Sequence, residues 1–192
     1  EIGATFFIGA ILMLMAFAIQ HRGILGTAKV QMVIGLLVVI PMLIVGIVPF
    51  INGSVHAANY SPLLPPAGEW SNGGWTQFFG ALFIAGWSTY AFETAVCYTR
   101  EFKNPASDTK KAIIAAGLLC VVLYTLVAAT FQGYLGLEGM TQPGIVDGTG
   151  VAAAMGNMVG GGSEFITHLL EMMMVLALIL AIMMAMAGSS RT

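Results

Sequence analysis

Charged residues are scarce in this sequence. They make up 8% of its 192 residues, whereas about a quarter of the residues in a soluble domain are charged. Hydrophobic residues account for 58% of the chain, and the mean hydropathy is +0.89. This balance excludes an ordinary soluble domain and predicts an integral membrane protein. With seven basic residues and a net charge of −2, we expect no nucleic-acid partner.

Cysteine and the common catalytic motifs are also poorly represented. The two cysteines, Cys97 and Cys120, lie within apolar stretches, so we expect small apolar residues there and no structural disulfide. No glycine-rich run is followed by Lys-Ser or Lys-Thr, which excludes a phosphate loop. Ser, His and Asp follow one another in no order typical of a hydrolase. We therefore expect neither enzymatic activity nor a cofactor.

Long apolar stretches nearly fill the chain. A helix needs about 20 mostly apolar residues to cross a bilayer, and five stretches of about this length are present. They cover residues 4–19, 30–50, 76–97, 112–134 and 165–187. We therefore predict an all-α polytopic membrane protein with five transmembrane helices.

Lys and Arg fall between these stretches in three clusters. The clusters are Arg22 with Lys29, then Arg100, Lys103, Lys110 and Lys111, and finally Arg191. Because cytoplasmic loops collect Lys and Arg, we place all three clusters in the cytoplasm. The N-terminus and the loops 51–75 and 135–164, which contain no basic residue, are then outside. We expect the protein in the plasma membrane.

Polar side chains interrupt the stretch 76–97 near its middle. The residues of this patch are Gly86, Trp87, Ser88, Thr89, Tyr90, Ala91, Phe92 and Glu93. A broken helix that lines a cavity exposes backbone groups that can bind a small ligand, whereas a helix among lipids gains nothing from such a patch. The alternative is a continuous helix whose Ser and Thr side chains bond to their own backbone carbonyls.

Glu93 is the ionisable residue of this patch. An ionised carboxylate near the membrane centre costs about 2.5–3.5 kcal/mol, so such a residue is normally protonated, paired or in contact with water. Glu93 is therefore a candidate proton carrier. The alternative is a neutral glutamic acid that is hydrogen-bonded to an adjacent helix.

Three segments of the chain carry motifs of one family. Residues 83–114 contain W-S-x-x-x-x-E, then E-F-K-N-P and K-K-A-I. Residues 26–31 read GTAKVQ, and residues 187–191 read AGSSR. Residues 83–114 resemble the sixth helix of amino acid permeases with its following loop. Residues 26–31 resemble the start of the fifth helix, and residues 187–191 resemble the end of the eighth. These permeases belong to the amino acid, polyamine and organocation (APC) superfamily, and the five predicted spans then match its fourth to eighth helices.

The resemblance implies part of a fold of two inverted five-helix repeats, which transports amino acids or related amines by alternating access. In the family the substrate binds where the sixth helix unwinds, which corresponds to the backbone from Ser88 to Ala91. By the same resemblance, Trp87 gates or stacks on the substrate, Tyr90 and Phe92 shape the pocket, and Glu93 links transport to protons. Proton symport and exchange both stay open.

The chain also departs from the family. Ala91 stands where the family often has Gly. The helices before the fourth and after the eighth are missing, including the first helix, whose loop binds the substrate carboxylate in the family. The sequence begins at Glu1 within an apolar run and ends at Thr192 just past a span. We therefore expect a piece of a larger transporter, whose missing helices complete the site.

Two other patterns lie in or beside the loop 135–164. Glu164, His168 and Glu171 share one face of a helix, a geometry seen in metal ligation and in proton relays; solvated or paired structural residues are the alternative. The glycine-rich segment 142–162 contains GNMVG at G-x-x-x-G spacing. It predicts either a close-packed short helix or a mobile loop, and we favour the mobile loop.

Three classes of function are compatible with these patterns. The first is a secondary amino acid transporter, and the second is a membrane-embedded enzyme or metal protein that uses Glu164, His168 and Glu171. The third is a non-transporting sensor or structural subunit. The transporter hypothesis accounts for the polar patch, for Glu93 and for the one-sided basic loops together, so we adopt it.

Overall fold

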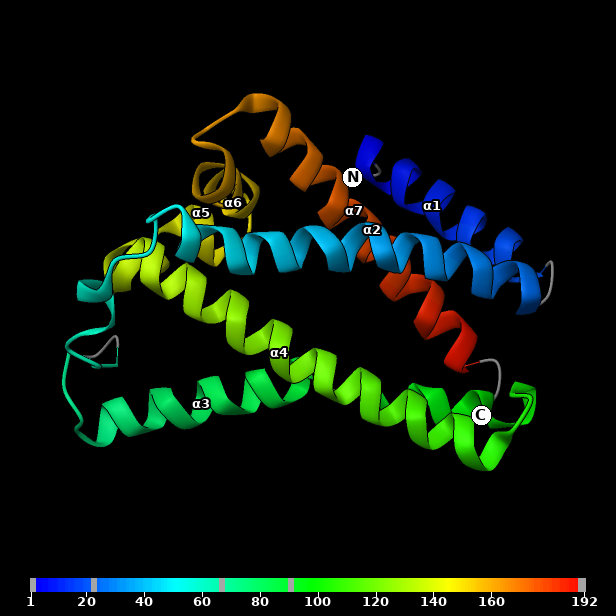
Figure 1. Ribbon diagram of the computed structural model, residues 1–192. Coiled ribbons are helices and arrows are strands. Elements are labelled where there is room, and N and C mark those ends of the chain that lie inside the picture. The colour runs from blue at the N-terminus through cyan, green and yellow to red at the C-terminus, as the bar shows by residue number, and fades with distance from the viewer. Residues whose placement is uncertain (1–2, 22–23, 66–67, 90–91, 190–192) are drawn as a thin grey trace.

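The computed structural model describes residues 3–21, 24–65, 68–89 and 92–189 (Figure 1). Every regular element in these ranges is a helix, which confirms the predicted all-α fold. In chain order the elements are α1 (Ala4–His21), α2 (Ile24–Ile51), η1 (Ala57–Tyr60), α3 (Asn72–Ser88), η2 (Phe92–Glu101), α4 (Pro105–Met140), α5 (Pro143–Val146), α6 (Val151–Gly160) and α7 (Glu164–Ser189).

Three of the described helices are long and apolar enough to cross a membrane. The segments concerned are Thr27–Ile51 in α2, Pro105–Met140 in α4 and Glu164–Met186 in α7. In α1 the apolar part, Phe6–His21, is shorter. The chain is therefore a polytopic membrane protein, as its composition predicted.

The long helices run back and forth between two ends of the molecule (Figure 1). We call these the loop end, which holds residues 52–65, 68–71 and 141–163, and the basic end, which holds Lys29 and residues 100–111. Between them, α2 lies at the centre and packs against both α4 and α7, while α1 packs against α7. This order places the connections between successive helices alternately at the two ends.

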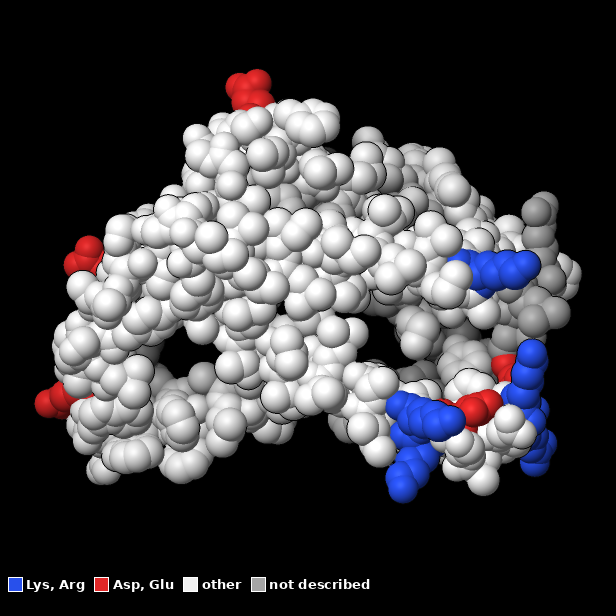
Figure 2. Space-filling model, viewed as in Figure 1, with Lys and Arg blue, Asp and Glu red and all other residues white. Residues whose placement is uncertain are grey.

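Positive charge is confined to the basic end in the part of the chain that the structure describes. Figure 2 shows the Lys and Arg side chains gathered there, away from the loop end. The described residues are Lys29, Arg100, Lys103, Lys110 and Lys111. Arg22 and Arg191 lie outside the described residues. The fold thus brings together at one end the basic residues that the sequence places in separate loops.

The buried core lies toward the loop end, where α2, α4, α6 and α7 converge. Its members are Val45, Phe131, Ala154, Met155, Met158, Leu170 and Met173. At Gly46 of α2 an added Cβ would lie 2.7 Å from the side chain of Leu126 in α4. The hydroxyl of the buried Thr130 donates to the Gly46 carbonyl at 2.8 Å. Close packing and a buried hydrogen bond therefore join α2 to α4.

The glycine-rich segment is helical where we expected a mobile loop, so the interpretation that we favoured is wrong. Within it, Pro143–Val146 forms α5 and Val151–Gly160 forms α6, which packs against α7 and α2. An added Cβ would collide with Thr167 of α7 at Gly156, and with Ile166 at Gly160. The G-x-x-x-G spacing puts both glycines on one face, and the absence of side chains there allows the two helices to approach closely.

α4 extends beyond the predicted span 112–134 and bends near its end. It continues to Met140 through Gly136, where the backbone has φ 64° and ψ −176°. These dihedral angles lie in a region that is essentially restricted to glycine. The bend therefore depends on the identity of this residue.

Candidate functional site

The predicted span 76–97 is interrupted in the structure. The α-helix α3 ends at Ser88, and the 3-10 helix η2 begins at Phe92. The Thr89 N–H donates to the Ala85 carbonyl at 3.1 Å, and the Thr89 hydroxyl donates to the Gly86 carbonyl at 2.9 Å. Thr89 thus satisfies two carbonyls of the last helical turn. The segment is not a continuous α-helix, although Thr89 does bond within its own helix as that alternative required.

The end of α3 is open to its surroundings. The Trp87 side chain is 76% exposed, and a Cβ added at Gly86 would meet no other atom within 4 Å. In the described part of the chain, α3 makes few contacts with other helices. Figure 1 shows that α3 diverges from α4 toward the N-terminus of α3. The space beside Gly86 and Trp87 is therefore accessible to a ligand or to a further helix.

The other side of the interruption is held in place. η2 packs along the beginning of α4, and its backbone starts with Phe92 and Glu93. The interruption consequently separates a helix with few contacts from one that is fixed to its neighbour.

The structure describes six of the eight predicted site residues. The residues at the end of α3 are Gly86, Trp87, Ser88 and Thr89, and those at the start of η2 are Phe92 and Glu93. Tyr90 and Ala91 lie outside the described residues. The involvement of all eight residues in substrate or proton binding stays a prediction.

The alternative site on α7 does not assemble as a metal centre. His168 Nδ1 lies 2.9 Å from Glu171 Oε2, and these two side chains are 73% and 54% exposed. In the part of the chain that the structure describes, no group of three His, Cys, Asp or Glu residues could hold a metal ion. Glu164, at the start of the same helix, therefore does not complete a metal site with this pair.

An arrangement at the loop end was not predicted from the sequence. η1 is fastened to α4 by Asn59 and Tyr60. Asn59 Nδ2 donates to the Gly133 carbonyl at 2.8 Å, and the Tyr60 hydroxyl donates to the Ala129 carbonyl at 2.8 Å. In return, Gln132 Nε2 donates to the Asn59 carbonyl at 2.9 Å. We call this set of contacts the η1 latch.

A cleft of about 470 Å³ lies beside the η1 latch, between residues 58–64 and residues 132–138 of α4. Nothing in the periodicity of the sequence pairs these two segments, which are far apart along the chain. The spacing of Gly133 and Gly136 near the end of a predicted span is the signal that could have indicated a close approach there.

At the loop end the charged side chains in Figure 2 are acidic, whereas at the basic end acidic side chains lie among the basic ones. At Asp147, both the hydroxyl and the N–H of Thr149 donate to Oδ1, at 2.7 and 2.9 Å. These two hydrogen bonds lower the pKa of the Asp147 carboxyl, since they favour its ionised form. The described structure is therefore electrically polarised along the direction of its long helices.

The fold defines a polytopic integral membrane protein in which one predicted span is interrupted. A model of the amino acid permease family matches residues 2–192. The chain therefore belongs to the amino acid permease family, whose members transport amino acids, and the resemblance inferred from its motifs is confirmed. No solved structure matches the chain.

Proposed function

We propose that the protein carries amino acids or related amines across the membrane by alternating access, with the substrate held at the interruption between α3 and η2. The observation that carries this proposal is the end of the α-helix at Ser88, within an apolar segment and next to the exposed Trp87. Membership of the amino acid permease family sets the class of substrate. Further helices of the transporter, as the family resemblance implies, would supply the remainder of the site.

The two helix ends at the interruption suit a zwitterion. The C-terminal end of an α-helix carries partial negative charge, and the N-terminal end of the following helix carries partial positive charge. Backbone carbonyls at the end of α3 would accept hydrogen bonds from a substrate ammonium group. The first N–H groups of η2 would favour its carboxylate. An α-amino acid supplies both groups, since its ammonium and its carboxylate are bonded to the same carbon atom.

Side chains around the interruption would add selectivity and coupling. Trp87 would cover the bound substrate, and Tyr90 and Phe92 would shape its pocket. Glu93 would bind a proton on one side of the membrane and release it on the other. Rocking of one group of helices against another then exposes the site alternately to the two sides. The cycle would run as proton symport or as exchange.

Uptake measurements test this proposal directly. Vesicles containing the protein, with the helices that complete the site, are supplied with a panel of radiolabelled amino acids at two external pH values. We expect saturable uptake of one class of amino acid or amine. Absence of uptake for the whole panel, in protein shown to be folded, would instead favour a non-transporting sensor or structural subunit.

Replacement of Trp87 by leucine tests the role of the exposed ring. We expect the KM for uptake to rise about tenfold, because an aromatic face over an ammonium group contributes on the order of 1–2 kcal/mol when water is excluded. The matched control is Trp75→Leu, which makes the same change near the other end of α3. An unchanged KM for Trp87→Leu would contradict a role for this ring in substrate binding.

Membrane sidedness is a separate part of the proposal, in which the basic end faces the cytoplasm of a cell and the loop end faces outside. Single cysteines are introduced by Ala57→Cys and by Lys103→Cys, in a background that lacks Cys97 and Cys120. Both positions are exposed. A membrane-impermeant thiol reagent added to intact cells is expected to label position 57 and not position 103. Labelling of position 103 alone would reverse the assigned orientation.

A further inference from the structure

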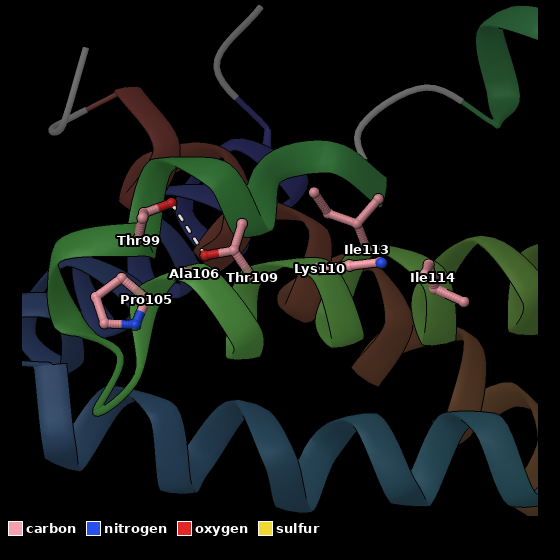
Figure 3. A pocket seen from close by; sticks show the side chains of 7 residues that line it. All are labelled: Thr99, Pro105, Ala106, Thr109, Lys110, Ile113 and Ile114. Atoms are coloured by element: carbon pink, nitrogen blue, oxygen red, sulfur yellow. Dashed lines mark hydrogen bonds between the residues drawn. The ribbon is translucent and has the colours of Figure 1, made fainter.

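The basic end contains a cleft between η2 and the first turns of α4 (Figure 3). Its volume is about 490 Å³. The lining residues are Thr99, Pro105, Ala106, Thr109, Lys110, Ile113 and Ile114. Apart from one lysine and two threonines, these side chains are apolar, so the cleft is suited to a ligand with a hydrocarbon part.

The hydroxyl groups of the two threonines are already used. The Thr109 hydroxyl donates to Thr99 Oγ1 at 3.4 Å, and the Thr99 hydroxyl donates to the Val96 carbonyl at 2.6 Å. Figure 3 shows the two threonine side chains pointing toward one another across the gap between η2 and α4. Of the polar residues that line the cleft, Lys110 therefore offers donors to a ligand.

The surface around the cleft carries excess positive charge. Residues 100–111 contain four basic and two acidic side chains, a net charge of +2. One of the acidic residues, Asp108, accepts a hydrogen bond from the Asn104 N–H at 3.1 Å and so serves the start of α4. Juxtamembrane groups of about four to eight Lys and Arg attract anionic lipid headgroups. The rim of the cleft is therefore complementary to an anion.

The apolar wall of the cleft continues into the membrane-crossing part of the molecule. Ile113 and Ile114 belong to the segment Pro105–Met140, which is long enough to cross a bilayer. The Ile114 side chain is 58% exposed. The cleft thus leads from a positively charged surface onto the apolar side of a transmembrane helix.

We propose that this cleft binds an anionic phospholipid, whose headgroup phosphate contacts Lys110 Nζ while an acyl chain lies along Ile113 and Ile114. A soluble anion would leave the apolar wall uncovered, and a zwitterionic lipid would gain little from the excess positive charge. The proposal is independent of the transport function, since it requires only that the basic end lies at a membrane surface.

The test is native mass spectrometry of the purified protein in detergent, titrated with phosphatidylglycerol or with phosphatidylcholine. We expect tighter binding of phosphatidylglycerol, and about a fivefold loss of its affinity in Lys110→Gln, the effect of one basic residue near an anionic surface. The matched control is Lys111→Gln, which removes the same charge from the next residue but does not line the cleft. Its affinity is expected to fall less, and Lys110→Arg is expected to retain the wild-type value.

Each other result would overturn the proposal. Equal binding of the two lipids would show that the headgroup charge is not recognised. An equal loss in Lys110→Gln and Lys111→Gln would show diffuse attraction to the whole basic end without a site in the cleft. Displacement of phosphatidylglycerol by soluble glycerol phosphate at similar concentration would identify a site for free anions. Thermal unfolding of each variant, expected to match the wild type, excludes loss of folding as the cause.

Discussion

Replacement of Glu93 by glutamine is expected to abolish the pH dependence of amino acid uptake while uptake itself persists. Glutamine has the size of a protonated glutamic acid but cannot release a proton. Glu93 lies at the second position of η2, directly after the interruption, in a segment predicted to lie at mid-membrane. If protonation of this side chain drives the transporter, wild-type uptake rises as the external pH falls, and the variant shows the same rate at both pH values.

Glu101→Gln provides the matched control for this experiment. Glu101 is the last residue of the same 3-10 helix, at the basic end of the molecule. The substitution removes the same charge from the same element, but at a distance from the interruption. We expect its uptake to keep the wild-type pH dependence. Retention of that pH dependence by Glu93→Gln would contradict the role of Glu93 as proton carrier and would move proton coupling to another part of the transporter.

The interruption of the third predicted span could be inferred from the sequence because it rests on local chemistry. Polar side chains in an apolar stretch cost free energy unless they face a cavity, water or one another. The sequence therefore indicated where the helix departs from an ordinary transmembrane helix, and α3 indeed ends at Ser88 within that patch. The all-helical fold could also be predicted from the sequence, because the length and apolar character of a stretch suffice to predict a membrane-crossing helix.

Other features depend on contacts between distant segments and could not be predicted in this way. Glycine content favoured a mobile loop at 142–162, yet α6 is ordered because Gly156 and Gly160 lie against α7. The same composition is compatible with both outcomes, and the partner helix decides between them. The docking of η1 on α4 likewise joins segments that are far apart along the chain, and no periodicity of the sequence pairs them.

The two ends of the molecule differ in how their helices are held and in where their charged side chains lie. At the loop end, the buried core holds α2, α4, α6 and α7 together, and the η1 latch fastens η1 to α4. At the basic end, η2 lies on α4 and the charged side chains face outward. The interrupted segment connects the two ends and has few contacts along α3. The contacts that hold the interrupted segment are therefore concentrated in η2, where it lies on α4.

Replacement of Gly133 by alanine is expected to destabilise the fold clearly. An added Cβ would collide with the Tyr60 hydroxyl and lie 2.6 Å from Val55 Cγ1. Overpacking of this kind costs about 1–3 kcal/mol. At roughly 2–4 °C for each kcal/mol in a chain of this size, the midpoint of thermal unfolding in detergent falls clearly below that of the wild type.

A double-mutant cycle assigns this effect to the η1 latch. Tyr60→Phe removes the hydroxyl that the new methyl group would strike, and it also removes the hydrogen bond to the Ala129 carbonyl. If the collision dominates, the double variant is more stable than the sum of the two single effects predicts. Gly80→Ala is the control, because a Cβ at that helical position meets no atom within 4 Å. The unfolding midpoint of this variant is expected to stay unchanged or to rise, since alanine is a better helix former than glycine. Strict additivity of Gly133→Ala and Tyr60→Phe would show that the Tyr60 hydroxyl is not the group that the added methyl group strikes.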